Sequence, residues 1–267
     1  MLRSLKLITA IGLGAMMLTG ISCSAFADDI AQGGRQVVDK WHSAIVTIEV
    51  VIKMSQTMDG KEGGNNESKT DVTGIVVDPS GLVATSLSAT DPADIMRRMM
   101  PDSDDKFSVN SQVTGVKIVG GDGIEVPAKI VLRDKDRDLV FIRPLKKLDK
   151  PMTAVDLSKG AKPALLDQVV VLHRLGKLAR REIAASVGRM GAVIQVPRLY
   201  YIPDGALNDD PGAAVFGMDA SPVGMVVMKF GSPSGGRMSM SGYSDMFAVI
   251  ILPTDDILEA AKQAPLQ

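Results

Sequence analysis

Short apolar runs alternate with turn residues along the chain, and residues 72–90 show this most clearly (VTGIVVDPSGLVATSLSAT). Residues 72–77 form a mostly β-branched run, and residues 82–85 resume the apolar pattern. Between them lies Asp78-Pro79-Ser80-Gly81, with Pro at the second turn position and Gly at the fourth, which suits a type I turn. The pattern therefore predicts a β-hairpin, whose second strand ends where residues 86–90 begin.

The same pattern of β-branched and apolar runs predicts strands over most of the remaining chain. These predicted strands are residues 44–54, 113–119, 124–132, 138–143, 168–173, 199–202, 214–216, 222–230 and 246–252, with one or two more strands in residues 182–196. Many short strands separated by turn signals are typical of an all-β sandwich or barrel. The spacing of apolar residues along these strands does not distinguish a sandwich from a barrel.

Helices are expected mainly at the two ends of the chain. Helical spacing of apolar residues predicts a helix over residues 28–42 and one or two helical turns over residues 92–100. Thr254 is expected to cap a C-terminal helix with Asp255 and Asp256 in its first turn, where negative charge is favourable. The polar, Gly-rich residues 55–71 and the Gly/Ser-rich residues 231–245 predict exposed loops.

Composition narrows the possible functions. The chain has 267 residues, a formal net charge of −1 and 45% hydrophobic residues, so it can bury a core and has no general attraction for nucleic acid or anionic lipid. Asp134, Asp136 and Asp138 alternate as at the start of a calcium loop. Leu139 and Leu145 stand where that loop needs Gly and Glu, so calcium is excluded there. We expect no metal and no cofactor.

The first 27 residues have the pattern of a signal peptide, with a basic start, an apolar run over residues 7–18 and small residues before a cleavage point after Ala27. This predicts a periplasmic or secreted protein without a membrane span after cleavage. Lipidation of Cys23, the only cysteine, is the alternative. Cleavage after Ala27 is preferred because Gly20 occupies the place of the large aliphatic residue in a lipobox.

Four segments resemble the protease domain of HtrA-type serine peptidases, which have the trypsin-like fold. Residues 72–90 are similar to the family's Asp-Pro-x-Gly hairpin, and residues 128–144 (AKIVLRDKDRDLVFIRP) to its segment around the catalytic Asp. Residues 209–227 (DDPGAAVFGMDASPVGMVV) lie where the family has its Gly-Asn-Ser-Gly-Gly-Pro segment, and the chain closes on a similar strand and helix. The resemblance implies two six-stranded barrels, over residues 28–148 and 149–267, with the active site between them. The chain ends where the family continues into a PDZ domain, so none is expected.

The family's triad has the chain order His, Asp, Ser, and these positions correspond here to Ser88, Asp138 and Pro211. Only Asp138 matches. Ser88 cannot replace an imidazole base, and Pro211 has neither a nucleophilic group nor the backbone N–H that the mechanism uses as an oxyanion donor. Asp209 and Asp210 add carboxylates beside the place where negative charge would develop. Asp138 is therefore expected to be a structural acid that bonds to backbone or to Ser88.

The resemblance thus implies a non-catalytic pseudoprotease that binds an extended peptide or another exported protein, for example by strand addition. An alternative is an active serine endopeptidase with rearranged residues, using His173 or Ser221. His42 and His173 are expected to be structural or exposed, and Ser221 to lie in a hairpin turn. A third possibility is a structural component of an exported assembly that makes contacts through the loops at residues 55–71 and 231–245. The oligomeric state does not follow from the sequence.

Overall fold

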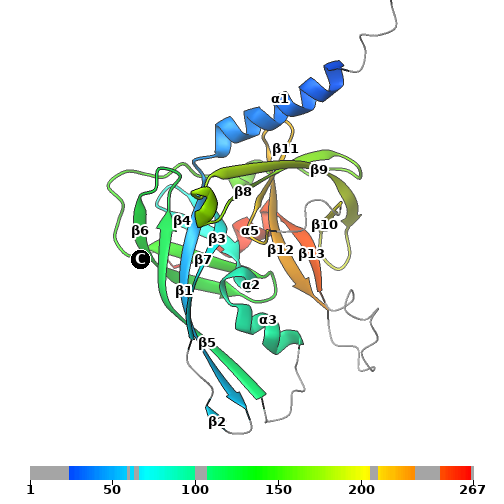
Figure 1. The fold of residues 1–267 in the computed structure, drawn as a ribbon. Helices are drawn as coiled ribbons and strands as arrows, with labels where there is room; N and C mark the ends of the chain where they lie inside the picture. Colours follow the sequence, from blue (N-terminus) through cyan, green and yellow to red (C-terminus); the bar gives the residue numbers. More distant parts are fainter. Residues whose placement is uncertain are drawn as a thin grey trace, which may run out of the picture.

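Two closed antiparallel β-barrels lie side by side (Figure 1). The computed structural model describes residues 24–58, 61–62, 66–99, 107–204, 210–231 and 247–265. Each barrel has six strands. The all-β prediction is therefore confirmed in its specific form, the trypsin-like double β-barrel.

Barrel 1 has the strand order β1-β3-β4-β7-β6-β5, and β5 closes the barrel by pairing with β1. Its strands are β1 (Ile45–Met58), β3 (Asn66–Asp78), β4 (Leu82–Ser86), β5 (Phe107–Val119), β6 (Glu125–Asp134) and β7 (Leu139–Pro144). The short strand β2 (Lys61–Glu62) pairs with the end of β1. Two helices, α2 (Leu87–Thr90) and α3 (Pro92–Met99), follow β4.

Barrel 2 has the strand order β10-β13-β12-β11-β8-β9. Its strands are β8 (Gln168–Arg174), β9 (Ile183–Ile194), β10 (Tyr200–Pro203), β11 (Ala214–Gly217), β12 (Pro222–Phe230) and β13 (Phe247–Pro253). The flanking helices are α1 (Ser24–Trp41), α5 (Thr254–Ala261) and the 3-10 turns η1 (Leu157–Lys159) and η2 (Lys177–Ala179). The predicted division at residue 149 falls in the connection between β7 and β8.

The hairpin predicted in residues 72–85 is confirmed, with its second strand, β4, ending one residue later at Ser86. The backbone N–H of Gly81 donates to the carbonyl of Asp78 at 2.9 Å, which closes the turn, and Gly81 has a φ of 93°. Such a positive φ favours glycine. β3 and β4 then pair through Ile75↔Ala84 and Val76↔Val83. The local turn chemistry was therefore sufficient to predict this element.

Several predicted boundaries are wrong. β1 extends to Met58 and β3 begins at Asn66, so most of the expected loop at residues 55–71 is strand. β5 begins at Phe107 instead of residue 113, because β1 pairs with it as far as Met58↔Phe107. Thr254 does not cap α5: the cap residue is Pro253, and no side chain bonds the helix start. Residues 1–23 with Cys23, and residues 232–245 of the predicted second loop, lie outside the described residues.

One hydrophobic cluster joins the two barrels and α1. It contains Val37 of α1, Phe141 of β7 and Phe216 of β11. Trp41 stacks on Phe216 with 5.6 Å between ring centroids, and its indole N–H donates to the carbonyl of Ala220 at 2.9 Å. The barrels therefore share a core in addition to their own interiors. Among the helices of the described segments, none is long and apolar enough to cross a bilayer.

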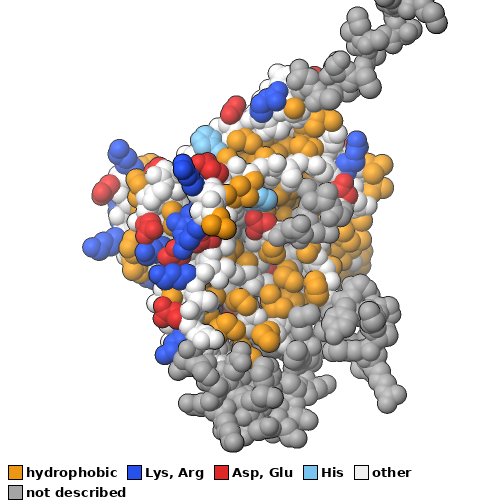
Figure 2. Space-filling model, viewed as in Figure 1, with side chains coloured by type: hydrophobic (Ala, Val, Ile, Leu, Met, Phe, Trp, Pro, Cys, Tyr) orange, Lys and Arg blue, Asp and Glu red, His pale blue; other side chains and the backbone are white. Residues whose placement is uncertain are grey.

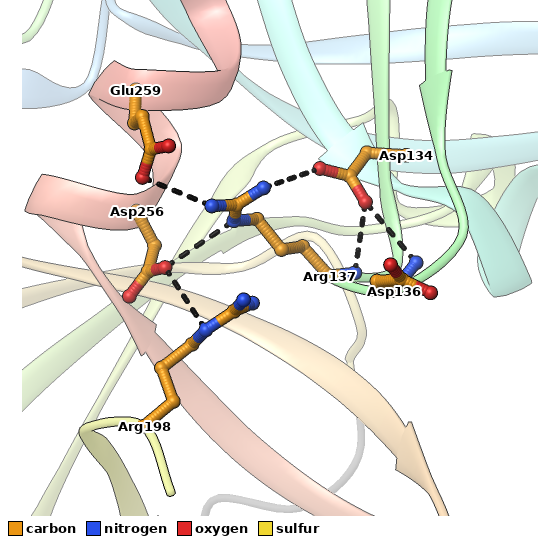
Figure 3. Close-up of polar contacts among 6 residues, drawn as sticks. All are labelled: Asp134, Asp136, Arg137, Arg198, Asp256 and Glu259. Carbon is orange, nitrogen blue, oxygen red and sulfur yellow. Dashed lines mark hydrogen bonds and ion pairs between the residues drawn. The ribbon is translucent and has the colours of Figure 1, made fainter.

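A partly buried arginine links the turn before β7 to the C-terminal helix (Figure 3). The Arg137 guanidinium donates to Asp134 at 3.0 Å, to Asp256 at 3.3 Å and to Glu259 at 3.0 Å. Only 13% of its side chain is exposed. Arg198 approaches the same Asp256 at 3.7 Å from the segment before β10. This network fastens α5, which follows barrel 2, onto barrel 1.

We expect Arg137→Met to lower the free energy of unfolding by about 2 kcal/mol, because it removes the cation that pairs with the largely buried carboxylates of Asp134 and Asp256. Arg198→Met is the matched control, since Arg198 is 49% exposed and its loss should cost about 0.5 kcal/mol. Urea titration of both variants measures the difference. Equal losses in the two variants would show that Arg137 is no more important than an ordinary surface ion pair.

Candidate functional site

Asp138 lies at the end of the β6–β7 turn, with 1% of its surface exposed, and both of its carboxylate oxygens are occupied. Oδ1 accepts hydrogen bonds from the backbone N–H of Ser88 at 2.8 Å and from its hydroxyl at 2.5 Å. Oδ2 accepts from the hydroxyl of Ser86 at 2.6 Å and from the backbone N–H of Met228 at 2.9 Å. The bond between Asp138 and Ser88 that the sequence predicted is confirmed.

The local backbone explains how these groups converge. Ser86 ends β4 and caps α2, since its hydroxyl accepts from the backbone N–H of Ala89 at 3.3 Å. The carbonyl of Asp138 accepts from the N–H of Leu87 at 2.9 Å, which fixes the start of the same helix. Asp138 itself has a φ of 55°, a left-handed conformation that Asp tolerates better than most residues. Backbone and side chain of Asp138 together hold the first turn of α2.

The environment of Asp138 is that of a structural acid. Burial raises the pKa of its carboxyl, and the four hydrogen bonds from Ser86, Ser88 and Met228 act in the opposite direction. No histidine contacts this carboxylate, and both histidines of the chain lie in described segments. A triad needs an imidazole between the acid and the nucleophile. At Asp138 the place beside the acid is taken by Ser88.

The segment around Pro211 is fixed between the two barrels. The N–H of Gly212 donates to the carbonyl of Val226 on β12 at 2.8 Å. Gly212 has a φ of 104°, and a Cβ built on it would lie 2.3 Å from the carbonyl oxygen of Thr73 and 2.7 Å from the hydroxyl of Thr85. Only glycine fits this close approach to barrel 1. Pro211 therefore sits in a tightly held turn; the neighbouring Asp209 lies outside the described residues.

A second acidic group, Asp210, lies beside this turn and contacts His173. Its Oδ2 is 3.5 Å from His173 Nδ1 and accepts a hydrogen bond from the Thr73 hydroxyl at 3.1 Å. Burial raises the pKa of the Asp210 carboxyl, while the charge of His173 and the bond from Thr73 lower it. Sequence reasoning named Asp210 and His173 separately and missed this contact, because the residues come from different strands and loops.

The residues proposed for a rearranged active site do not meet. Ser221 lies in the β11–β12 turn, as predicted, and its hydroxyl donates to Asp219 at 2.5 Å. On the β8–β11 pair, Ala214 is opposite Leu172, the neighbour of His173, whereas Gly217 at the Ser221 end is opposite Val169. Three residues of strand span about 10 Å. Ser221 and His173 therefore lie at opposite ends of this strand pair.

His42 is exposed, and its Nδ1 lies 3.0 Å from the carbonyl of Val38 in α1. It contacts neither Asp138 nor a serine hydroxyl among the described residues. This position agrees with the expectation that His42 is an exposed or structural histidine.

A small cavity opens between the barrels beside Met228. Barrel 1 contributes Asp136 and Arg137 to its wall, and barrel 2 contributes Arg198, Tyr200 and Met228 among others. Its volume is about 20 Å³, which is room for about one water molecule. As lined by the described residues, this cavity is too small to enclose a peptide side chain.

Comparison of the chain with protein-family models and with curated proteins gives no match.

Proposed function

We propose that the chain is an exported, non-catalytic pseudoprotease related to HtrA-type peptidases, which uses the double barrel to bind an extended peptide or a protein partner. The observation that carries this proposal is the occupied carboxylate of Asp138. Its two oxygens are taken by Ser86, Ser88 and Met228, and Pro211 stands where a nucleophile would be needed. The signal-peptide pattern of residues 1–27 supports export.

The chain lacks several of the groups that serine-type peptide hydrolysis needs. A serine mechanism needs a base, a hydroxyl that the base can reach, and preorganised donors for the oxyanion. Ser88 cannot serve as the base, and Pro211 supplies neither the hydroxyl nor a backbone donor. Asp210 would in addition oppose negative charge developing next to it. Losing one part would slow catalysis, whereas losing all of them removes the triad mechanism.

Strand addition along β12 is the binding mode that the topology favours. β12 pairs with β13 along its length, up to Phe230↔Phe247. On its other side, pairing with β11 stops at Ala214↔Met225, and the backbone of Val226 then bonds to that of residues 212 and 213. Beyond that point no described strand pairs with this side of residues 227–229, where the backbone N–H of Met228 donates to Asp138 at 2.9 Å. The proposal places an extended peptide against this edge, beside the contact between Met228 and Asp138.

The test of the non-catalytic proposal is hydrolysis of unfolded casein by the purified chain. We expect no cleavage above background, and the same background for Asp138→Asn, because no step of the reaction depends on this carboxylate. Gel analysis and mass spectrometry of the products detect cleavage, and circular dichroism checks that the variant is folded. Specific cleavage that disappears in folded Asp138→Asn would contradict the proposal.

The binding mode has its own test, since an inactive protein need not bind peptides. Hydrogen exchange of the chain is measured with and without excess unfolded casein. We expect added protection in β12 and none in β5, which lies in the other barrel. Protection elsewhere, with β12 unchanged, would contradict strand addition at this edge.

A further inference from the structure

A continuous series of polar contacts connects the surface of β8–β9 with the turn at Pro211. Arg181 donates to Asp71 at 2.8 Å and to Glu49 at 2.9 Å, and its own carbonyl lies 3.3 Å from Arg174 Nη1. The backbone N–H of Arg174 donates to the Thr73 hydroxyl at 3.0 Å. Figure 2 shows positive and negative side chains side by side in the region of η2.

At the inner end of this series, Thr73 donates to Asp210, and Asp210 faces His173. Thr73 belongs to barrel 1 and is 1% exposed, whereas His173 and Asp210 belong to barrel 2, with side chains 27% and 30% exposed. The carboxylate of Asp210 therefore connects β8, the turn at Pro211 and barrel 1.

Among the residues that the structure describes, few charged groups lie around this contact. The cation that acts on Asp210 is His173. The guanidinium of Arg174 is turned toward barrel 1, where it donates to the carbonyls of Ile45 at 2.8 Å and His42 at 2.6 Å. Burial lowers the pKa of Arg174, while the charge of Glu182 raises it. Arg181 and Lys177 are paired with Glu49 and Asp71. The charge of His173 is therefore the variable part of this environment.

We propose that His173 and Asp210 form a pH-dependent clasp that holds residues 210–213 against barrel 1. The distance of 3.5 Å between Nδ1 and Oδ2 is longer than a good N–H···O hydrogen bond, so a neutral imidazole contributes little. A protonated imidazole at the same distance adds an ion pair in a half-buried place, where the attraction is stronger than in water. This inference stands whether or not the chain binds peptides.

The direction of the pH effect follows from the two groups. Histidine gains a positive charge when it is protonated, so the clasp tightens as the pH falls. At still lower pH Asp210 takes up a proton and the ion pair is lost, and burial moves this loss to a higher pH because it raises the pKa of Asp210. The clasp is tightest between these two titrations and looser on either side.

Hydrogen exchange of residues 210–215 at pH 5.5 and pH 8.0, corrected for the intrinsic effect of pH on exchange, measures the clasp directly. We expect protection of this segment to be about two- to fivefold greater at pH 5.5, the size of a partly exposed ion pair. His173→Gln removes the charge and should abolish the difference. His42→Gln is the matched control, because His42 is exposed and faces backbone carbonyls, and it should preserve the difference.

Asp210→Asn tests the other half of the pair and keeps the shape of the side chain, so it remains informative if His173→Gln disturbs folding. It should also abolish the difference in protection between the two pH values. A pH difference that persists in both His173→Gln and Asp210→Asn would overturn the clasp. Its disappearance in His42→Gln would do so as well.

Discussion

Replacing Asp138 with alanine is expected to lower the free energy of unfolding by about 3–5 kcal/mol, the range for breaking a buried charged network. The substitution leaves the N–H groups of Ser88 and Met228 without their acceptor in a buried place. It also removes the link between α2 of barrel 1 and β12 of barrel 2. Urea denaturation followed by circular dichroism measures the loss.

Asp138→Asn should recover little of this stability. Each carboxylate oxygen faces one backbone N–H, that of Ser88 or that of Met228, so the amide nitrogen meets a donor in either orientation. Asp136→Ala is the matched control, because Asp136 is exposed in the same turn and its loss should change stability by no more than about 0.5 kcal/mol. If Asp138→Asn were as stable as the parent, the carboxylate would not be the required acceptor.

Gly212→Ala is expected to lower the free energy of unfolding by about 2–5 kcal/mol, from the left-handed backbone together with overpacking. The added methyl group would collide with the carbonyl oxygen of Thr73 and the hydroxyl of Thr85, both of which are buried. Since neither group can move without disturbing β3 or β4, the turn at Pro211 should be displaced from barrel 1. Thermal denaturation measures the cost.

Gly123→Ala separates the cost of the left-handed backbone from the cost of overpacking. Gly123 also has a positive φ, 78°, but a Cβ built there meets no atom within 4 Å. Its substitution should therefore cost only the backbone component, about 1–2 kcal/mol. Equal losses in the two variants would mean that the close approach of Gly212 to Thr73 contributes nothing to the stability of the fold.

The sequence predicted those parts of the fold whose signals are local. The turn at Asp78–Gly81 and the turn before Pro222 depend on residues within a few positions of each other, and both are found. The length of β1 depends instead on pairing with β5, as at Met58↔Phe107, between segments far apart in the chain. Polar residues such as Ser55 have weak strand propensity, so only this pairing makes them strand.

The distinction between local signals and contacts of distant segments applies to the candidate site as well. The bond between Ser88 and Asp138 could be predicted because the resemblance to HtrA-type peptidases aligned both positions. The contact between His173 and Asp210 has no local signal, since it forms only when β8 of barrel 2 lies beside the turn at Pro211. The carboxylate of Asp210 next to Pro211 could be noted in the sequence. That His173 is its partner depends on how β8 pairs with β11 in barrel 2.

Asp138 connects these observations to the proposed function. Its donors come from both barrels, with Ser86 and Ser88 in barrel 1 and Met228 in barrel 2. Under the proposed relationship to HtrA-type peptidases, Asp138 stands at the position of the carboxylate that orients a histidine, and here it holds two barrels and a helix together. The proposal therefore accounts for a buried acid without a catalytic base.

The most direct test of a non-catalytic double barrel is reaction with a fluorophosphonate probe followed by intact-mass measurement. The probe modifies a serine only if a neighbouring base activates its hydroxyl. We predict no adduct on the folded chain, because Ser88 and Ser221 each donate to an aspartate and neither contacts a histidine. A stoichiometric adduct on one serine that disappears in His173→Gln would contradict the proposal and identify an active site.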